Sequence, residues 1–200
     1  MKYSTFILVG VCVIIFLLQI SIQGFTDNFV LKKELLFNEP WRLLTSIFLH
    51  SGIPHLLLNM FSLALFGIIL EKLIGSNKFL LVFFASGIIA NLIAVNFYSS
   101  SLGASGAIYG ILGCLAIIKP LMMIWAFGFP MPMFIAAILW VGAGVLGVFM
   151  PSNVGDIAHL SGIGIGFIIG LVLREWRKAK KELMRVPEGY MRIWENNYMR

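Results

Sequence analysis

The sequence predicts an all-α polytopic membrane protein whose chain crosses the bilayer six times. Of its 200 residues, 60% are hydrophobic and only 12% are charged. A soluble domain of this size lacks the interior volume to hide so much apolar surface from water, so lipid is the expected solvent. Six apolar stretches, each bounded by charged residues, proline, glycine or asparagine, supply the expected transmembrane helices: Ser4–Gln23, Pro54–Leu70, Phe79–Phe97, Ser105–Ile118, roughly Met133–Met150, and Ile157–Leu173.

The first stretch is expected to be a spanning helix rather than a cleaved signal peptide. Its apolar run, Ser4–Ile22, is long for the hydrophobic part of a signal peptide. The sequence Ser21-Ile22-Gln23 is also a poor match to the small-x-small pattern of a cleavage site.

The fourth stretch, Ser105–Ile118, is too short to span a membrane. About 14 helical residues cover about 21 Å, whereas the hydrocarbon core of a bilayer is about 30 Å thick. We therefore expect a short central helix, the fourth of six. Its N-terminus should be sunk in the protein interior, below a water-filled cavity.

Two connections carry more apolar residues than ordinary loops do. The segment Gly24–Ile53 is rich in Phe and Leu and includes Trp41, so it is expected to lie on or in the membrane interface. The segment Leu121–Pro132 is interrupted by Gly128 and two prolines. It is either an interfacial connection or the early part of the fifth helix.

The basic residues predict the orientation of the chain. With a cytoplasmic N-terminus, twelve of the 15 Lys and Arg residues lie on the inner side, and only Lys32, Lys33 and Arg42 lie outside. This asymmetry is the one that membrane proteins show, so both termini are expected in the cytoplasm and the protein in the cell membrane. Residues 1–173 would form the transmembrane domain, and residues 174–200 a basic, lipid-facing tail. The tail lacks the aromatic and basic interleaving of a nucleic-acid-binding segment, so no nucleic-acid partner is expected.

Four polar side chains from three of the expected helices fall at a similar depth. Counted from the cytoplasmic ends of their helices, Ser105, His159, His55 and Asn59 lie about 17 to 22 Å up. Polar groups inside a bilayer are costly, which makes such a cluster a candidate functional site.

The chemistry of these residues fits nucleophilic catalysis. A serine hydroxyl is a weak nucleophile until a base takes its proton, and histidine is the usual base, so Ser105 and His159 could form a pair. Ser105 also begins a helix, whose free backbone N–H groups favour a developing oxyanion. His55 and Asn59, four residues apart on one helix face, could donate to the same oxyanion. Tyr109 could hold the His159 ring by stacking.

Glycines recur on the two helices that would carry this pair. They are Gly106, Gly110 and Gly113 on the fourth helix, and Gly162, Gly166 and Gly170 on the sixth. Small residues at this spacing let two helices approach closely, as a serine–histidine hydrogen bond requires.

Several motifs resemble those of the rhomboid family of intramembrane serine proteases. The run Gly103-Ala104-Ser105-Gly106-Ala107-Ile108-Tyr109 resembles the family's G-x-S-G-x-x-Y, and His55 with Asn59 is similar to its H-x-x-x-N. Ala158, His159 and Gly162 resemble A-H-x-x-G on the last core helix. Trp41-Arg42 is similar to the W-R pair of the first outer loop, and Glu71 stands where the family has an acidic residue. The resemblance covers nearly the whole chain, in the right order.

The resemblance implies a rhomboid-like six-helix bundle of the minimal prokaryotic form, with an active site that opens toward the outer face. It implies a Ser105–His159 dyad, an oxyanion hole made by the Ser105 backbone N–H, His55 and Asn59, and no cofactor. Substrates would be single-span membrane proteins that enter laterally from the bilayer when the fifth helix and the loop Pro151–Asp156 move. The supporting residues that it implies are Tyr109, Gly103, Gly106 and Gly162.

The remaining polar residues are interpreted structurally. His50 is expected to make a structural hydrogen bond to the outer loop, and Asp156 to cap the last helix rather than to complete a triad. Trp41 suits the membrane interface, and Arg42 can hold loop carbonyls or a lipid phosphate. Glu71 is likewise counted as structural.

Other functions are disfavoured by features of the sequence. No H-E-x-x-H is present and the histidines lack carboxylates at ligand spacing, so no metal site is expected. No helix carries the central Asp of an aspartyl intramembrane protease. A small-solute transporter would predict an inverted repeat, and none is visible. A catalytically silent relative that binds membrane clients is the remaining alternative, because it would share the same fold.

Overall fold

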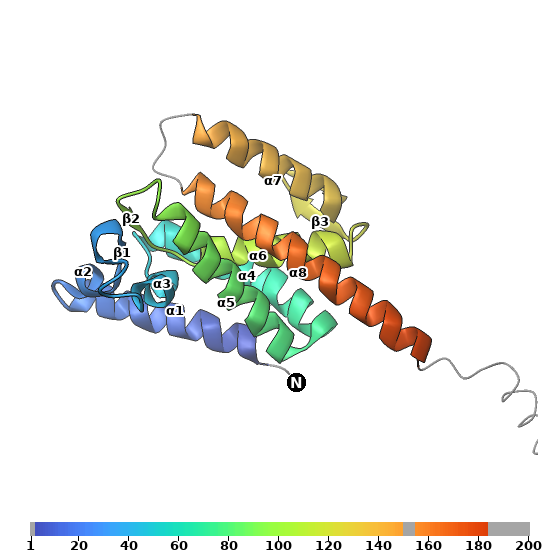
Figure 1. The fold of residues 1–200 in the computed structure, drawn as a ribbon, viewed down its shortest axis with the longest axis horizontal. Coiled ribbons are helices and arrows are strands. Elements are labelled where there is room, and N and C mark those ends of the chain that lie inside the picture. The colour runs from blue at the N-terminus through green and yellow to red at the C-terminus, as the bar shows by residue number, and fades with distance from the viewer. Residues whose placement is uncertain (1–2, 150–154, 184–200) are drawn as a thin grey trace, which may run out of the picture.

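The structure, a computed structural model, is mostly helical and describes residues 3–149 and 155–183. Figure 1 shows the described elements packed as one bundle. The helices, in chain order, are α1 (Ser4–Ser21), α2 (Phe25–Phe29), α3 (Arg42–Thr45), α4 (Ile53–Ile74), α5 (Ser76–Ala94), α6 (Ser105–Ile118), α7 (Met133–Val148) and α8 (Asp156–Leu183). The short elements are the strands β1 (Leu31–Lys32), β2 (Ser100–Ser101), β3 (Met123–Ala126) and β4 (Phe129–Pro132), and the 3-10 turns η1 (Lys33–Leu35) and η2 (Ser46–Phe48).

Four of the described helices, α1, α4, α5 and α8, are long and apolar enough to cross a membrane. Helices α6 and α7 are apolar but shorter, with 14 and 16 residues. All six expected helices are therefore present as elements, and the bounds of α6 agree with the expected Ser105–Ile118. The other bounds differ by a few residues, so that Glu71, expected just after the second helix, lies in the last turn of α4.

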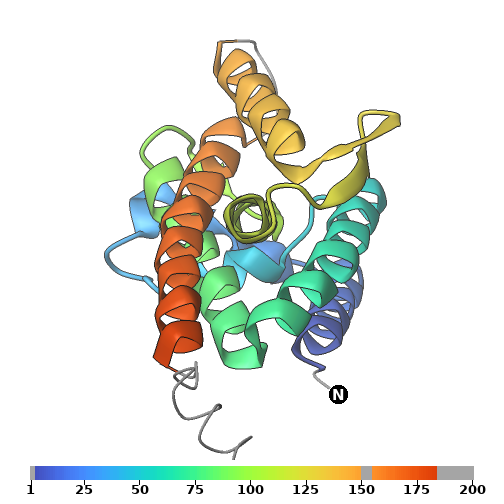
Figure 2. The ribbon, with the colours of Figure 1, turned by 90° about the vertical axis from the view of Figure 1, so that its right-hand side faces the viewer.

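The short helix α6 lies at the centre of the bundle, between longer helices. Figure 2 shows it end-on, with α8 on one side, α4 on the other and α7 above. Ten of its 14 residues are buried. Its own Ile111 and Leu115 are completely buried, as are Leu63 on α4 and Phe79 and Phe83 on α5. Elsewhere, long apolar side chains point outward, as a protein with lipid as its solvent requires; on α4 these include Leu57, Leu58 and Phe61.

The two connections depart from the expectation of an all-α chain. Within Gly24–Ile53, the short helices α2 and α3 are joined by irregular backbone, and β1 pairs with β2 in an antiparallel ladder, Leu31 opposite Ser101. The segment Leu121–Pro132 is neither coil nor helix, because β3 and β4 form an antiparallel hairpin. Its turn holds Phe127 and Gly128, both with positive φ (54° and 89°), and two adjacent positive-φ residues are the backbone of a tight hairpin turn.

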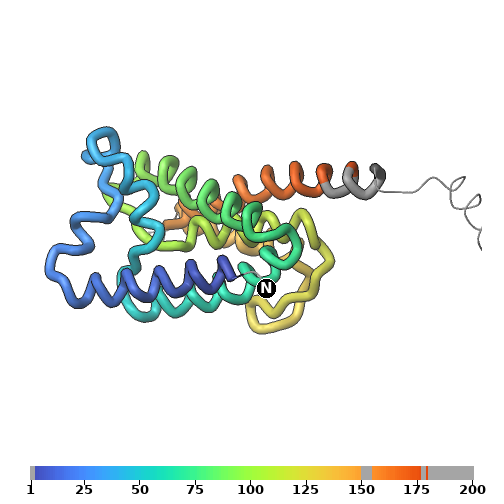
Figure 3. The backbone as a smooth tube through the Cα atoms, turned by 90° about the horizontal axis from the view of Figure 1, so that it is seen from below, coloured from blue at the N-terminus to red at the C-terminus, as the bar shows by residue number. Residues whose placement is uncertain are grey.

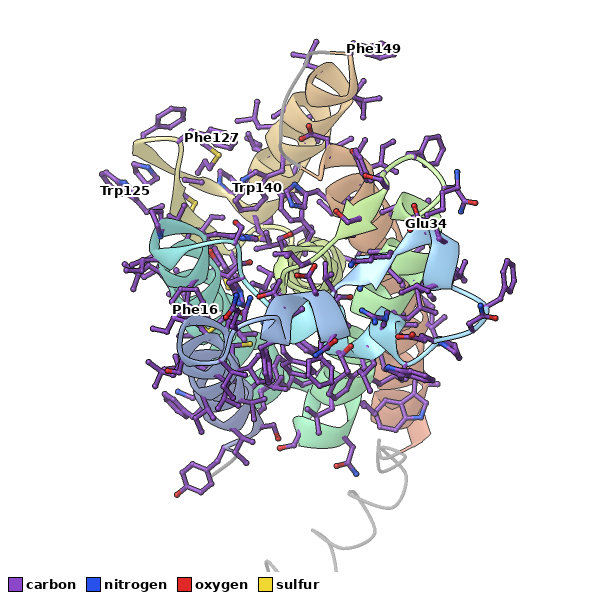
Figure 4. All side chains as sticks on the ribbon, turned by 90° about the vertical axis from the view of Figure 1, so that its left-hand side faces the viewer. Phe16, Glu34, Trp125, Phe127, Trp140 and Phe149 are labelled. Atoms are coloured by element: carbon purple, nitrogen blue, oxygen red, sulfur yellow. The ribbon has the colours of Figure 1, made fainter. Side chains whose placement is uncertain are left out.

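The hairpin exposes two aromatic side chains, of which Phe127 also lies against Trp140 of α7, with ring centroids 6.1 Å apart. Trp125 is 72% exposed and Phe127 52% exposed, and Figure 4 shows both on its outer part. Aromatic rings are enriched where a membrane meets water, so this placement suits the first of the two alternatives for this segment, an interfacial connection.

Candidate functional site

Ser105 is the first residue of α6, and the chain before it is held on both sides. Strand β2 pairs with β1, and the Gly103 N–H donates to the Ser46 carbonyl at 2.9 Å. Gly103 has φ of +121°, a conformation that side-chain-bearing residues rarely adopt. This bend lets the chain turn from the strand into α6 with the serine hydroxyl at the start of the helix.

His159 lies in the first turn of α8, and its Nε2 is 2.9 Å from the Ser105 Oγ. The Tyr109 ring stacks on the imidazole, with centroids 4.3 Å apart and planes 6° from parallel. The hydrogen bond and the stacking contact therefore fix both the position and the plane of the His159 ring.

Glycines make this contact between α6 and α8 possible. A Cβ on Gly162 would lie 2.1 Å from the Gly106 carbonyl oxygen, and one on Gly166 would lie 2.1 Å from the Gly110 carbonyl oxygen. Both distances are far inside van der Waals contact, so the two backbones approach more closely than any other residue would allow.

His55 and Asn59 lie on α4 and face the region around Ser105 and His159. The Asn59 side-chain amide donates to the His55 carbonyl oxygen at 2.8 Å, and Asn59 is buried. A Cβ on Gly103 would lie 2.8 Å from Cε1 and 3.0 Å from Nε2 of His55. One edge of the imidazole therefore rests against the backbone that leads into Ser105.

A cavity of about 930 Å³ connects these residues. Its lining includes Ser51, His55, Asn59, Ser105, Tyr109 and His159. The four polar residues that the sequence places at a similar depth thus share one cavity.

His50, in the loop before α4 and outside the membrane-spanning segments, is buried beside the cavity. Its Nδ1 lies 3.2 Å from the Phe48 carbonyl, and its backbone N–H donates to the Gln19 side chain at 2.9 Å. Its ring meets the His55 ring edge-on at 5.2 Å. Burial, helped by the neighbouring His55 and opposed by the Phe48 carbonyl, lowers the pKa of His50 from 6.5 to about 4. The ring is therefore neutral near pH 7.

The remaining expected residues lie away from the Ser105–His159 contact. Arg42 is buried; it donates to the carbonyls of Asp27 and Val30 at 2.8 and 2.9 Å and pairs with Glu39. Trp41, next to it, is 53% exposed.

Glu71 joins the start of α1 to the turn between α4 and α5. Its carboxylate accepts hydrogen bonds from the backbone N–H groups of Ser4 and Thr5, the Thr5 hydroxyl and the Ser76 hydroxyl. These bonds give Glu71 an anchoring position within the helix bundle.

Asp156 begins α8 and packs against α7. A Cβ on Gly147 would lie 2.5 Å from its carboxyl carbon. The N–H of the next residue, Ile157, donates to the Tyr98 hydroxyl at 3.2 Å. The expectation that Asp156 caps this helix stays a prediction.

One feature of the site was not expected from the sequence: Ser51 lies beside His55. Its hydroxyl is 3.0 Å from His55 Nδ1. The sequence does carry a signal, since the serine is four residues before the histidine.

Within residues 3–149 and 155–183, no group of three or more His, Cys, Asp or Glu side chains has an arrangement that could hold a metal ion.

Comparison with known proteins places the chain in a family. The family model described as the rhomboid domain matches residues 38–176, which is more than half of the chain. The chain belongs to the rhomboid family. It is a multi-pass membrane protein, as the family and the apolar helices together require.

Three rhomboid relatives illustrate the match. RHOMBOID-like protein 6, mitochondrial, of Arabidopsis thaliana is 35% identical over 144 residues, which cover 71% of this chain and 46% of that protein. Rhomboid protease GluP of Bacillus subtilis is 34% identical, over 84% of this chain and 34% of its own length. Rhomboid protease GlpG of Haemophilus influenzae is 28% identical, over 89% and 94%. The match thus spans less than half the length of the first two relatives and nearly all of the third.

Proposed function

We propose that this rhomboid-family chain is an intramembrane serine endopeptidase that cuts a peptide bond in or near the transmembrane segment of single-span membrane proteins. The observation that carries the proposal is the 2.9 Å contact between Ser105 Oγ and His159 Nε2, inside a cavity between apolar helices. Two of the relatives above are named as rhomboid proteases, which supports the same reaction class.

In the proposed topology, α1, α4, α5, α6, α7 and α8 are six membrane-crossing segments. Helix α6, about 21 Å long, would be the short central one, and water would reach its N-terminus from the outer side. Figures 1 and 3 support a common side for both ends of the described bundle, because α1 begins and α8 ends toward the same end. With the basic residues counted as above, that end is cytoplasmic and the protein resides in the cell membrane.

In this topology we divide the chain into a transmembrane domain, residues 1–173, and a basic tail, residues 174–200. The end of α8 supports a division near this point, because Figure 1 shows this helix continuing beyond the other helices of the bundle. Residues 184–200 lie outside the described part of the chain.

The proposed reaction begins with the Ser105–His159 pair. His159 Nε2 takes the hydroxyl proton as Ser105 Oγ attacks the scissile carbonyl carbon, which gives a tetrahedral intermediate. The intermediate collapses to an acyl-enzyme, and the protonated His159 gives its proton to the leaving amine. A water molecule, deprotonated by His159, then hydrolyses the acyl-enzyme and restores the serine. The stacked Tyr109 ring would keep the imidazole in line through these proton transfers.

Three donors are proposed for the negative oxygen of that intermediate. Ser105 begins α6, so its backbone N–H is free of the helix's own hydrogen bonds. The His55 imidazole and the Asn59 amide face the same cavity from α4. One amide hydrogen of Asn59 is donated to the His55 carbonyl oxygen, and this bond fixes the side chain. The second amide hydrogen therefore has a fixed direction and is available to the oxyanion. Donors aimed in advance at a developing charge lower the barrier without reorganisation in the reaction.

The substrate is proposed to enter laterally from the bilayer when α7 and the loop Pro151–Asp156 move. Helix α7 suits such movement because only four of its 16 residues are buried. Residues 150–154 of the loop lie outside the described residues. Lipid is the other expected partner.

The test is cleavage of a model single-span substrate in proteoliposomes by wild type, Ser105→Ala and His159→Ala. Wild type is expected to cut, and each variant to lose at least about 1,000-fold in rate, because neither half of the pair works alone. A fluorophosphonate probe should label wild type and leave Ser105→Ala unlabelled. Equal cleavage by all three proteins would contradict the mechanism. Client binding with neither cleavage nor labelling would favour the silent client-binding alternative.

A further inference from the structure

The His55 imidazole receives two contacts from Ser51, both at the same ring nitrogen. The Ser51 hydroxyl lies 3.0 Å from Nδ1, and the Ser51 backbone N–H donates to Nδ1 at 3.4 Å. A hydroxyl can either donate or accept, but a backbone N–H can only donate. Nδ1 is therefore the acceptor, and the ring hydrogen of a neutral His55 lies on Nε2.

The Nε2 edge of the ring faces the chain that leads into Ser105. A Cβ on Gly103 would meet Cε1 and Nε2 of His55 at 2.8 and 3.0 Å, and the Ser105 Oγ at 3.9 Å. The unsubstituted side of Gly103 thus faces both the Nε2 edge of His55 and the Ser105 hydroxyl. The opposite ring nitrogen is the one that Ser51 holds.

We propose that Ser51 is a positioning residue that holds His55 as the Nε2–H tautomer, with this N–H directed at the oxyanion that forms beside Ser105. The proposal rests on the proposed protease function. Ser51 does not touch the reacting atoms; it acts through His55. The terminal torsion of a histidine has two broad minima, so an imidazole without a partner at Nδ1 can turn over and can carry its hydrogen on either nitrogen. In such a ring the donor faces Ser105 only part of the time.

Removal of the hydroxyl should therefore lower catalysis without lowering substrate binding. In Ser51→Ala the backbone N–H remains, so the loss is partial. We expect kcat to fall about fivefold, the worth of one ordinary hydrogen bond, while KM stays unchanged. Ser51→Thr keeps a hydroxyl at the same position and should restore kcat. Ser21→Ala, at an exposed serine that ends α1 and does not line the cavity, is the control and should behave as wild type.

A double-mutant cycle separates positioning from a general effect on the fold. If Ser51 acts only through His55, then Ser51→Ala should cost nothing further in a His55→Ala background. A fivefold loss in both backgrounds would overturn the proposal, because the hydroxyl would then act by another route.

The ring nitrogens of His55 can also be observed without any substrate. In micelles, ¹⁵N NMR of histidine-labelled protein, with the His55 signals assigned by His55→Gln, should show hydrogen on Nε2 in wild type and in Ser51→Thr. In Ser51→Ala only the longer 3.4 Å contact from the backbone N–H remains at Nδ1, so the Nδ1–H tautomer should gain population and the two ring signals should move part of the way toward each other. Hydrogen on Nδ1 in wild type, or an unchanged spectrum in Ser51→Ala, would overturn the proposal.

The two readouts keep this proposal distinct from the protease function. If wild type cuts no substrate and takes no fluorophosphonate, the protease function fails, while the NMR result still decides whether Ser51 sets the tautomer. If wild type cuts and the spectrum changes in Ser51→Ala with kcat unaltered, the positioning role in catalysis is overturned.

Discussion

Helices α6 and α7 are both short and apolar, but they pack against α8 in different ways. Ten of the 14 residues of α6 are buried, against four of the 16 residues of α7. On the α6 side, a Cβ added to Gly162 would meet a backbone carbonyl at 2.1 Å. On the α7 side, a Cβ on Gly144 would meet the tip of the Leu160 side chain at 3.0 Å. Backbone cannot move aside, whereas the end of a leucine can.

The difference matches what each helix is proposed to do. A hydrogen bond of 2.9 Å between side chains on α6 and α8 tolerates little relative movement, and direct backbone packing fixes it. Helix α7 is proposed to move when substrate enters, so contacts through side-chain tips, which can rearrange, suit it. The three changes below test this contrast, from the largest expected effect to the smallest.

Gly162→Ala should separate α6 from α8. The added methyl group would lie 2.1 Å from the Gly106 carbonyl oxygen, so one helix must shift. We expect a loss of about 2–3 kcal/mol in stability and at least about 100-fold in cleavage rate, because a displacement of about 1 Å misaligns the pair. Unfolding in micelles and cleavage in proteoliposomes measure the two effects. Gly142→Ala is the control, because a Cβ there meets nothing within 4 Å. Wild-type activity in Gly162→Ala would show that the α6–α8 contact is looser than described.

Tyr109→Leu should leave this packing intact but free the His159 ring. The stacking contact at 4.3 Å would be lost, while a residue of moderate size still fills the space. An aromatic pair contributes about 1 kcal/mol beyond its buried area, so cleavage should slow by about fivefold with little change in stability. Tyr109→Phe keeps the ring and should retain most of the activity. Equal rates in the Leu and Phe variants would mean that the stacking contributes nothing to catalysis.

Gly144→Ala, on the α7 side, should have the smallest effect. The Leu160 side chain can turn away from the new methyl group, so we expect a change in stability below about 1 kcal/mol and a cleavage rate within about threefold of wild type. Measured beside Gly162→Ala under the same conditions, this variant compares the two contacts of α8 directly. A loss as large as that of Gly162→Ala would remove the contrast between α6 and α7.

Much of the site is visible in the sequence because each residue type carries its own chemical signal. Ser105, His159, His55 and Asn59 stand out as polar groups in apolar stretches, and their shared cavity agrees with the depth estimated from helical rise. Ser51 does not stand out, since an exposed serine near a helix start is common. Its proposed role depends on the direction of the His55 ring, which sequence spacing does not specify.

The hairpin β3–β4 shows another limit of the sequence. Its prolines and glycine predict an interruption correctly, but the usual signals for a two-residue hairpin turn, Asn-Gly or Asp-Gly, are absent. Here the turn is Phe127-Gly128, and only the folded backbone reveals the positive φ of the phenylalanine.

The sequence alone determined that the chain is built of apolar helices, that the one over residues 105–118 is short, and that serine, histidine and asparagine lie among them. These properties depend on composition and on the fixed rise of a helix, both of which are local. The tertiary structure decided which groups touch: the 2.9 Å contact between Ser105 and His159, the glycine-mediated approach of α6 and α8, and the nitrogen of His55 that Ser51 engages. Contacts of this kind depend on how two helices are placed and rotated relative to each other, and that placement results from the packing of the whole bundle.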